Sequence, residues 1–285
     1  MVQIIEMMQM QDLFVSTSCL GGTRDLQEIL EIYSAHGIKN VELSGGLDCT
    51  GDAEGILKKH SHLNFIIHNY FPPVSYPFIM NLASQDAMIR ERSVAICKKA
   101  IDLCAQFRCR LYSFHPGFRV EKTLGLNFEF AGERLVSYEA AFEKFAISVE
   151  DISAYAKIKG VKIALENLEH KNEAYMMTRP EEFSHIQDIF PEVGVLLDLG
   201  HLKIASKRLG FRIDEFIRAV QDNILEVHIH ENDGKEDLHW EPLKSELMEL
   251  LLRVDCQTIV LESRNLSAER IILNLRALEE ACIRI

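Results

Sequence analysis

The feature of this sequence that most constrains its fold is a regular alternation of short apolar runs with longer segments of helical period. Eight runs rich in Val, Ile, Leu and Phe are each followed by a segment that fits a helix, although the second helix, around 53–61, has the weakest pattern. The predicted strands cover residues 13–19, 40–46, 64–70, 110–116, 162–168, 193–201, 224–230 and 257–263. Strands that alternate with helices form parallel sheets, because each helix returns the chain to the same end of the sheet.

Eight strand–helix units in 285 residues indicate an α/β fold of the closed (β/α)8 TIM-barrel type rather than an open doubly wound sheet. The sequence has no Gly-x-Gly-x-x-Gly after the first strand and no Gly-Lys-Ser/Thr loop, so signatures of dinucleotide and P-loop folds are absent. No linker or low-complexity tract interrupts the alternation. We therefore expect a single domain over residues 1–285, with residues 1–11 as an N-terminal extension of unassigned structure.

Charge and composition narrow the class of protein further. With 31 Lys and Arg against 43 Asp and Glu, the formal charge is -12, which disfavours nucleic acid as a partner but allows one local basic patch. No apolar stretch is long enough to span a membrane and no signal peptide is recognised, so we expect a cytoplasmic protein without a membrane partner. The seven cysteines include no C-x-x-C pair, which argues against a disulfide framework and a thiolate zinc site.

Histidines and carboxylates gather at the ends of the predicted strands. The C-terminal ends of barrel strands build the active site in this fold. From the third strand to the eighth, these ends carry His68, His115, Glu166, Asp198, His201, His228, His230 and Glu262. Such a ring would be costly to bury without a compensating cation. Imidazole and carboxylate groups are ligands for zinc, manganese or iron, so the pattern predicts a divalent metal site.

Five short segments, in order along successive strands, carry a family resemblance. They are "SFHPG" (113–117), "ALEN" (164–167), "LLDLGH" (196–201), "VHIHENDGKEDLH" (227–239) and "VLES" (260–263). Together they resemble the xylose-isomerase-like TIM-barrel superfamily, which includes sugar isomerases, ketose 3-epimerases and apurinic endonucleases of the endonuclease IV type. The resemblance covers nearly the whole barrel.

The resemblance implies a set of metal ligands. The shared metal core, which is also the single-metal set of the ketose epimerases, corresponds to Glu166, Asp198, His230 and Glu262. The additional ligands of the endonuclease type correspond to His68, His115, His201, Asp237 and His239. His230 is preferred to His228 in the core because "HEND" resembles the His-x-Asn-Asp of the family. One to three divalent metals per chain (Zn, Mn, Mg, Co or Fe) are therefore implied.

Two reaction types fit this ligand set. In a sugar or sugar-phosphate isomerase or epimerase, Glu166 and Glu262 would stand on opposite walls, one removing a proton and the other returning it. In a zinc phosphodiesterase, the same cluster would cleave abasic DNA. The fuller ligand list favours the second, and the charge of -12 favours a small carbohydrate. We predict the isomerase or epimerase, with the endonuclease as the alternative. A third reading, a silent barrel used only for binding, is disfavoured because both glutamates are present.

Other residues near the strand ends are candidates for contacts to substrate, each with a structural alternative. They are Glu42, Tyr70, Asn167, His228 and Arg264. Glu42 and Asn167 suit sugar hydroxyls or the polar interior of a barrel, whereas Tyr70 suits a sugar ring or packing within its loop. His228 faces the same side as His230, one layer deeper. Arg264 suits a phosphate, a carboxylate or a surface salt bridge. A homo-oligomer is compatible with all of these readings.

Overall fold

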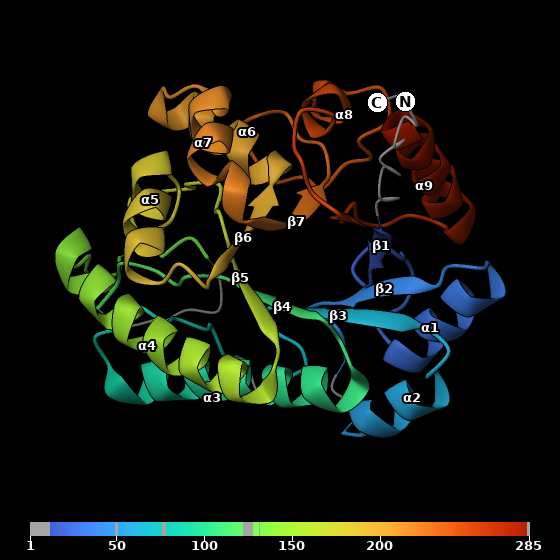
Figure 1. Cartoon of the computed structure of the whole chain (residues 1–285), viewed down its shortest axis with the longest axis horizontal. Coiled ribbons are helices and arrows are strands. Elements are labelled where there is room, and N and C mark those ends of the chain that lie inside the picture. The colour runs from blue at the N-terminus through green and yellow to red at the C-terminus, as the bar shows by residue number, and fades with distance from the viewer. Residues whose placement is uncertain (1–11, 49–50, 76–77, 122–127, 131, 284–285) are drawn as a thin grey trace, which may run out of the picture.

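A computed structural model describes residues 12–48, 51–75, 78–121, 128–130 and 132–283. The eight strands of this part of the chain are parallel and pair in sequence order, and the eighth pairs with the first to close the barrel (Figure 1). The predicted (β/α)8 fold is therefore confirmed. The expected extension at residues 1–11 lies outside the described residues.

All eight predicted strands are present, and each ends one to three residues before its predicted C-terminal end. Their bounds are β1 Asp12–Ser16, β2 Asn40–Leu43, β3 Asn64–His68, β4 Leu111–Phe114, β5 Lys162–Glu166, β6 Gly194–Asp198, β7 Ile224–Ile229 and β8 Thr258–Leu261. The helices are α1 Leu26–Ala35, α2 Ala53–Lys59, α3 Ala87–Phe107, α4 Tyr138–Lys159, α5 Pro180–Ile189, α6 Leu199–Leu209, α7 Ile213–Val220, α8 Glu246–Leu251 and α9 Ala268–Ile283, with a short 3₁₀ turn η1 at Gln221–Asn223. Among the described helices, none is long and apolar enough to cross a membrane.

Local signals in the sequence set the ends of the long helices α3 and α4, which run side by side along the barrel in Figure 1. The Asp86 carboxylate accepts hydrogen bonds from the first backbone N–H groups of α3. Ser137 caps α4 in the same way, and Gly160 ends it with φ of 68°, a left-handed conformation that glycine adopts without strain. These caps satisfy backbone groups that would otherwise lack partners.

The interior of the barrel has an apolar lower half and a polar upper half. The lower half is filled by one buried cluster, contributed by Phe14, Ile66, Leu111, Ala164, Leu196 and Val260. Two residues further along each of these strands, the side chain on the same face is polar, namely Ser16, His68, Ser113, Glu166, Asp198 and Glu262. The period of two therefore places these polar residues at the C-terminal end of the barrel, above a mainly apolar layer that also holds the buried carboxylates of Glu42 and Glu226.

The difference at the end of the sixth strand matters for the site. The sixth strand was expected to run to His201, but β6 ends at Asp198 and α6 begins at Leu199, with no loop between them. The Asp198 carboxylate caps the new helix by accepting a hydrogen bond from the His201 backbone N–H at 2.6 Å. The turn of helix carries His201 back over the mouth of the barrel.

A buried asparagine joins the loops that follow β3 and β4. The Asn81 side chain is fully buried, donates to the carbonyl of Phe118 and accepts from the N–H groups of Phe118 and Ala83. Gly117 lies against it with φ of +108°. A Cβ at Gly117 would approach the Asn81 Oδ1 to 2.4 Å and the Leu82 nitrogen to 2.8 Å. Only glycine fits this junction.

We expect Gly117→Ala to lower the free energy of unfolding by about 2 to 4 kcal/mol, from backbone strain together with the clash against Asn81. The matched control is Gly37→Ala, where φ is +77° but an added Cβ meets nothing within 4 Å. Its cost should be about 1 kcal/mol, because only the backbone term is present. Urea unfolding followed by circular dichroism measures both, and equal costs for the two variants would contradict the role given to Asn81.

Candidate metal centre

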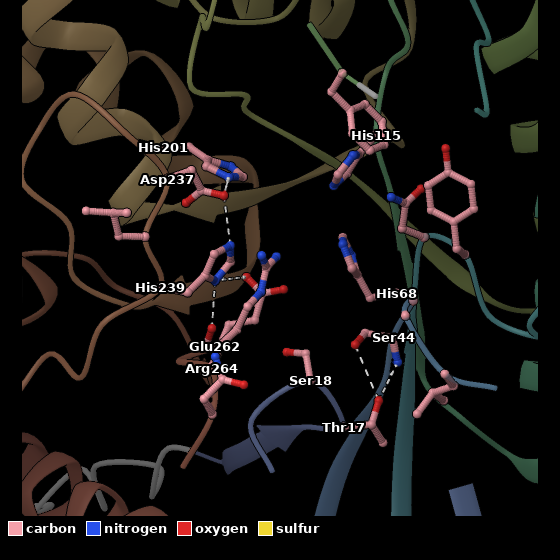
Figure 2. Close-up of a pocket in the computed structure, with 18 of the residues that line it drawn as sticks. Thr17, Ser18, Ser44, His68, His115, His201, Asp237, His239, Glu262 and Arg264 are labelled. Carbon is pink, nitrogen blue, oxygen red and sulfur yellow. Dashed lines mark hydrogen bonds and ion pairs between the residues drawn. The ribbon is translucent and has the colours of Figure 1, made fainter. Parts of the chain in front are cut away.

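The polar end of the barrel opens into a cavity of about 1270 Å³. Of the residues singled out from the sequence, those that line it are His68, Tyr70, His115, Glu166, His201, Asp237, His239, Glu262 and Arg264. Figure 2 shows His68 and His115 on one side, with His201, Asp237, His239 and Glu262 on the other. Among the described residues, five overlapping groups of potential ligands lie around this space, and two of them contain His228, namely Glu42–His68–His228 and Glu166–Asp198–His228. The other three surround the cavity as follows.

The first group centres on Glu166 at the end of β5. Its Oε2 lies 2.8 Å from Nε2 of His115 and 3.3 Å from Nε2 of His68. Its other oxygen, Oε1, lies 3.0 Å from Nδ1 of His201, on the far side of the cavity. The Glu166 carboxylate therefore bridges the two sides of the site.

The second group lies deeper and consists of Asp198, His230 and Glu262, whose ligand atoms are within 4.8 Å of one another. Oδ1 of Asp198 is used by the cap of α6, and its Oδ2 lies 3.1 Å from Nε2 of His230. Gly200 makes room for the His230 ring, because a Cβ there would approach the ring atoms to between 2.2 and 2.7 Å. Because α6 follows β6 directly, the helix cap orients Asp198, and Gly200 in the first turn leaves space for His230.

The third group consists of His201, Asp237 and His239, joined by His230. Oδ2 of Asp237 lies 2.8 Å from Nε2 of His239 and 3.6 Å from Nε2 of His201. The loop after β7 presents Asp237 and His239 because it closes on itself through paired backbone hydrogen bonds between Glu231 and Trp240. This closure turns the loop back over the cavity.

Hydrogen bonds on the far ring nitrogens fix how several histidines point. Nδ1 of His239 donates to the carbonyl of Glu262 at 2.7 Å, and Nδ1 of His201 contacts the carbonyl of Asn167 at 3.0 Å. Nδ1 of His68 contacts the Ser113 hydroxyl at 3.0 Å. For His68 and His239, Nε2 faces the site, whereas Nδ1 of His201 also lies 3.0 Å from Oε1 of Glu166. Histidines that hold metals are commonly oriented in this way by a partner on the second nitrogen.

Burial and neighbouring charges shift the pKa of most groups in the site. Burial lowers the pKa of His68 to about 4, so its imidazole is neutral at pH 7. Burial opposes ionisation of Glu166, but His115 and His68 outweigh it and hold its pKa well below the usual range. For His201, burial favours the neutral ring, but Asp198 and Asp237 outweigh it and raise the pKa well above the usual range. Without a cation, protons on imidazoles compensate the carboxylates.

The chemistry and packing of these groups fit a divalent cation. Oε2 of Glu166, Nδ1 of His230 and Oδ1 of Asp237 are buried without a hydrogen-bond partner among the described residues. Close approach of ligand atoms without hydrogen-bond geometry is costly for polar groups, but it is what coordination to a common ion requires. Oxygen and imidazole nitrogen are suitable donors for zinc, manganese or iron.

Two residues expected near the substrate lie beneath the cavity instead of lining it. Glu42 and His228 are fully buried, and Oε2 of Glu42 lies 2.7 Å from Nε2 of His228. Nδ1 of His228 lies 3.3 Å from Oε2 of Glu262. Burial raises the pKa of Glu42 to about 7, although His228 opposes the shift. Their contacts orient Glu262 from below.

The other residues expected to contact the substrate are Asn167, Tyr70 and Arg264, and only the last two line the cavity. Asn167 braces β6, because its side chain donates to the carbonyl of Asp198 and accepts from the Asp198 N–H. Tyr70 lines the cavity, and its hydroxyl accepts a hydrogen bond from the N–H of Met80 at 2.6 Å. Arg264 lines the cavity with its side chain exposed.

Sequence reasoning missed some residues that border the cavity. Glu169 lies 3.9 Å from Nε2 of His201, and burial raises its pKa. Thr17, Ser18 and Ser44 bring hydroxyl groups from the ends of β1 and β2. In the sequence, only their position just after a strand distinguishes these hydroxyl residues, and serine and threonine are also common at that position in ordinary turns.

Comparisons with known proteins agree with this architecture. The chain is 27% identical over 228 residues to the uncharacterized protein MJ1614 of Methanocaldococcus jannaschii, with 79% of each chain covered. It is 27% identical over 187 residues to apurinic-apyrimidinic endonuclease 1 of Plasmodium berghei, which covers 61% of this chain and 32% of that protein.

Solved structures share the fold. A D-tagatose 3-epimerase-like protein superposes with a TM-score of 0.74 at 20% identity, covering 96% of this chain and 98% of the other. A protein from Thermus thermophilus soaked with ZnCl2 gives 0.65 at 18% identity, covering 96% and 99%. Endonuclease IV from the same organism gives 0.58 at 17% identity, also covering 96% and 99%. At these identities the likeness concerns the fold alone. A family model described as a xylose isomerase-like TIM barrel matches residues 23–264, and the chain therefore belongs to the xylose isomerase-like TIM barrel family.

Proposed function

We propose that this protein is a divalent-metal-dependent sugar isomerase or epimerase in which Glu166 and Glu262 transfer the proton. The observation that carries the proposal is the placement of these two carboxylates. Both line the cavity, one from β5 and one just after β8, and Asp198 belongs to a ligand group with each of them. A substrate held there would lie between two carboxylates, as removal and return of a proton require.

The metal core proposed for this reaction is Glu166, Asp198, His230 and Glu262, as the family resemblance implies. When bound, a divalent metal polarises a substrate carbonyl and makes the neighbouring C–H more acidic. The carboxylates of Glu166 and Glu262 have pKa values held well below the usual range by nearby histidines that outweigh their burial, so each is ionised and able to accept a proton. His228, supported by Glu42, fixes the position of Glu262.

The rest of the cavity suits a polyhydroxylated substrate. Hydroxyl groups of Thr17, Ser18 and Ser44 line the part of the cavity below His68 and Glu262 in Figure 2. The D-tagatose 3-epimerase-like protein, whose name refers to a ketose epimerase, shares this barrel at a TM-score of 0.74. The formal charge of -12 disfavours a DNA backbone as the main ligand.

A zinc phosphodiesterase acting on abasic DNA is the second candidate, and one specific observation favours it. His201, Asp237 and His239 form a third ligand group that a single-metal epimerase does not require. One of the related sequences is also an apurinic-apyrimidinic endonuclease. Experiment can separate the two functions, because an isomerase and a phosphodiesterase act on different substrates although both would depend on Glu166.

The first test is incorporation of solvent deuterium into a panel of ketoses and aldoses by the Mn²⁺-loaded or Zn²⁺-loaded protein, with nicking of abasic DNA measured in parallel. We expect deuterium incorporation, reduced by about 100-fold to 10,000-fold in Glu166→Gln and in Glu262→Gln, because each variant lacks one proton-transferring carboxylate. Circular dichroism checks that the variants fold. Nicking at low enzyme concentration that is lost in Glu166→Gln, without exchange into any sugar, would establish the second candidate instead.

A matched pair of variants tests the metal core. Asp198→Asn keeps an oxygen for the cap of α6 but removes the negative charge beside His230, so the metal affinity should fall by at least about 100-fold. Asp237→Asn alters the third group and should leave the core metal bound. Elemental analysis after dialysis measures both. Retention of all metal by Asp198→Asn, or its complete loss from Asp237→Asn, would refute the assigned core.

Metal binding should release protons and weaken as the pH falls. Asp198 neighbours both His201 and His230 and, against the effect of burial, raises the pKa of each imidazole, so both bind a proton more tightly in the metal-free protein than a free imidazole does. A bound metal requires neutral imidazole, and protons therefore compete with it. Titration calorimetry with Zn²⁺ in two buffers of different ionisation enthalpy should show proton release, and the affinity should be higher at pH 8 than at pH 6. An affinity that is unchanged between these pH values would contradict the assignment.

A further inference from the structure

Arg264 occupies a distinctive position at the mouth of the cavity. It follows Glu262 by two residues, just beyond the end of β8, and its exposed side chain lines the cavity. Figure 2 shows it beside Glu262, among the side chains that surround the cavity. Arg264 therefore brings a positive charge to the edge of the cavity that Glu262 also lines.

The guanidinium of Arg264 has no hydrogen-bond acceptor or carboxylate partner within reach among the described residues. The other arginines at the cavity are engaged. Arg208 donates to the carbonyls of His170, Lys171 and Lys235, which ties two loops together. Arg24 donates to the carbonyl of Gly46 at 2.6 Å and pairs with Asp48 at 3.5 Å. Arg264 alone among these arginines keeps its donors for a ligand.

Lysines at the cavity differ from Arg264 in their surroundings. Lys171 pairs with Glu129 at 2.5 Å. Lys235 lies on the loop that carries Asp237, and its charge is close enough to the Asp233 carboxylate to help lower the pKa of that group. A guanidinium also binds a carboxylate or phosphate through two parallel hydrogen bonds, which an ammonium cannot do.

The backbone that carries Arg264 is held on two sides. The N–H of Arg264 donates to the carbonyl of His239 at 2.9 Å. Two residues later, Leu266 pairs with the loop after β1, donating to Cys19 and accepting from Gly21 at 2.9 and 2.8 Å. A fixed backbone reduces the entropy lost when the side chain binds a ligand. The same pairing brings the loop that follows Thr17 and Ser18 alongside Arg264.

We propose that Arg264 binds an anionic group, a carboxylate or a phosphate, on the sugar substrate. This inference rests on the proposed function, and it narrows the substrate class to acidic or phosphorylated sugars. In a protein of net charge -12, with carboxylates around the site, a neutral sugar needs no unpaired guanidinium at this position. The cation compensates the one substrate charge that the surroundings would otherwise repel.

The test compares matched neutral and anionic sugars by titration calorimetry on the full-length Mn²⁺-loaded protein. The pairs are D-fructose with D-fructose 6-phosphate, and D-glucose with D-glucuronate. We expect the wild type to bind the anionic member of at least one pair about 10-fold to 100-fold more tightly, the effect of one charge-assisted contact. The pair that shows the preference distinguishes phosphate from carboxylate.

The decisive variant is Arg264→Met, with Arg276→Met as the control for loss of one positive charge. Arg276 lies on α9 and does not line the cavity. Arg264→Met should lose the preference for the anion and keep its affinity for the neutral sugar, whereas Arg276→Met should keep both. Because the metal contributes to binding in every protein, the difference between variants isolates Arg264.

Three results would overturn the inference: no preference for either anion in the wild type, a preference that survives in Arg264→Met, or no binding of any of the four sugars. Failure of the proposed function has a different signature. If no sugar exchanges deuterium but the anion preference depends on Arg264, the isomerase assignment fails and the anion site stands. If a sugar exchanges deuterium but the wild type and Arg264→Met show the same preference between anionic and neutral sugars, the isomerase assignment stands and the anion site fails.

Discussion

The architecture of the site depends on one electrostatic constraint, the burial of four carboxylates and several imidazoles at one end of a closed sheet. Glu166, Asp198 and Glu262 are almost inaccessible to solvent, and Asp237 lies just above them. Such a cluster is stable only if protons or metal ions balance its charge. The apolar cluster below, which includes Phe14 and Val260, gives these charges no water to solvate them from that side.

Much of the fold was predictable because the barrel repeats a simple pattern eight times. Runs of β-branched and apolar residues identified every strand, and helical periodicity identified the long helices. The errors occurred where local chemistry replaced periodicity. "LGH" continues the apolar character of β6, but the carboxylate of Asp198 caps a helix at that point and ends the strand. The pattern predicted one helical segment after each strand, but the connection after β6 holds both α6 and α7, separated at Gly210, which ends α6 with φ of 75°.

The site was predictable to the extent that its residues fall at strand ends. Strand alternation predicted His228 one layer deeper than His230, and it lies beneath the cavity in contact with Glu42. For Glu42 the sequence left two positions open, the substrate or the polar interior of the barrel, because no pattern marks which polar residue of a short strand reaches the cavity. Glu169 escaped notice because its position depends on the path of the loop after β5. Asp237 and His239 come together with His201 only because a pair of backbone hydrogen bonds folds their loop back, a long-range contact that no local pattern encodes.

Gly200 and His230 constrain which residues can stand at each other's positions. The ring of His230 occupies the space that a side chain at position 200 would need, although an alanine at position 200 would favour the helix. A barrel that keeps the histidine must therefore keep the glycine, whereas one that replaces the histidine with a smaller residue is released to gain helix stability. Across the family, we expect these two positions to vary together. A residue other than glycine at position 200 would then identify, from sequence alone, a barrel that has lost the histidine at position 230 and changed its chemistry.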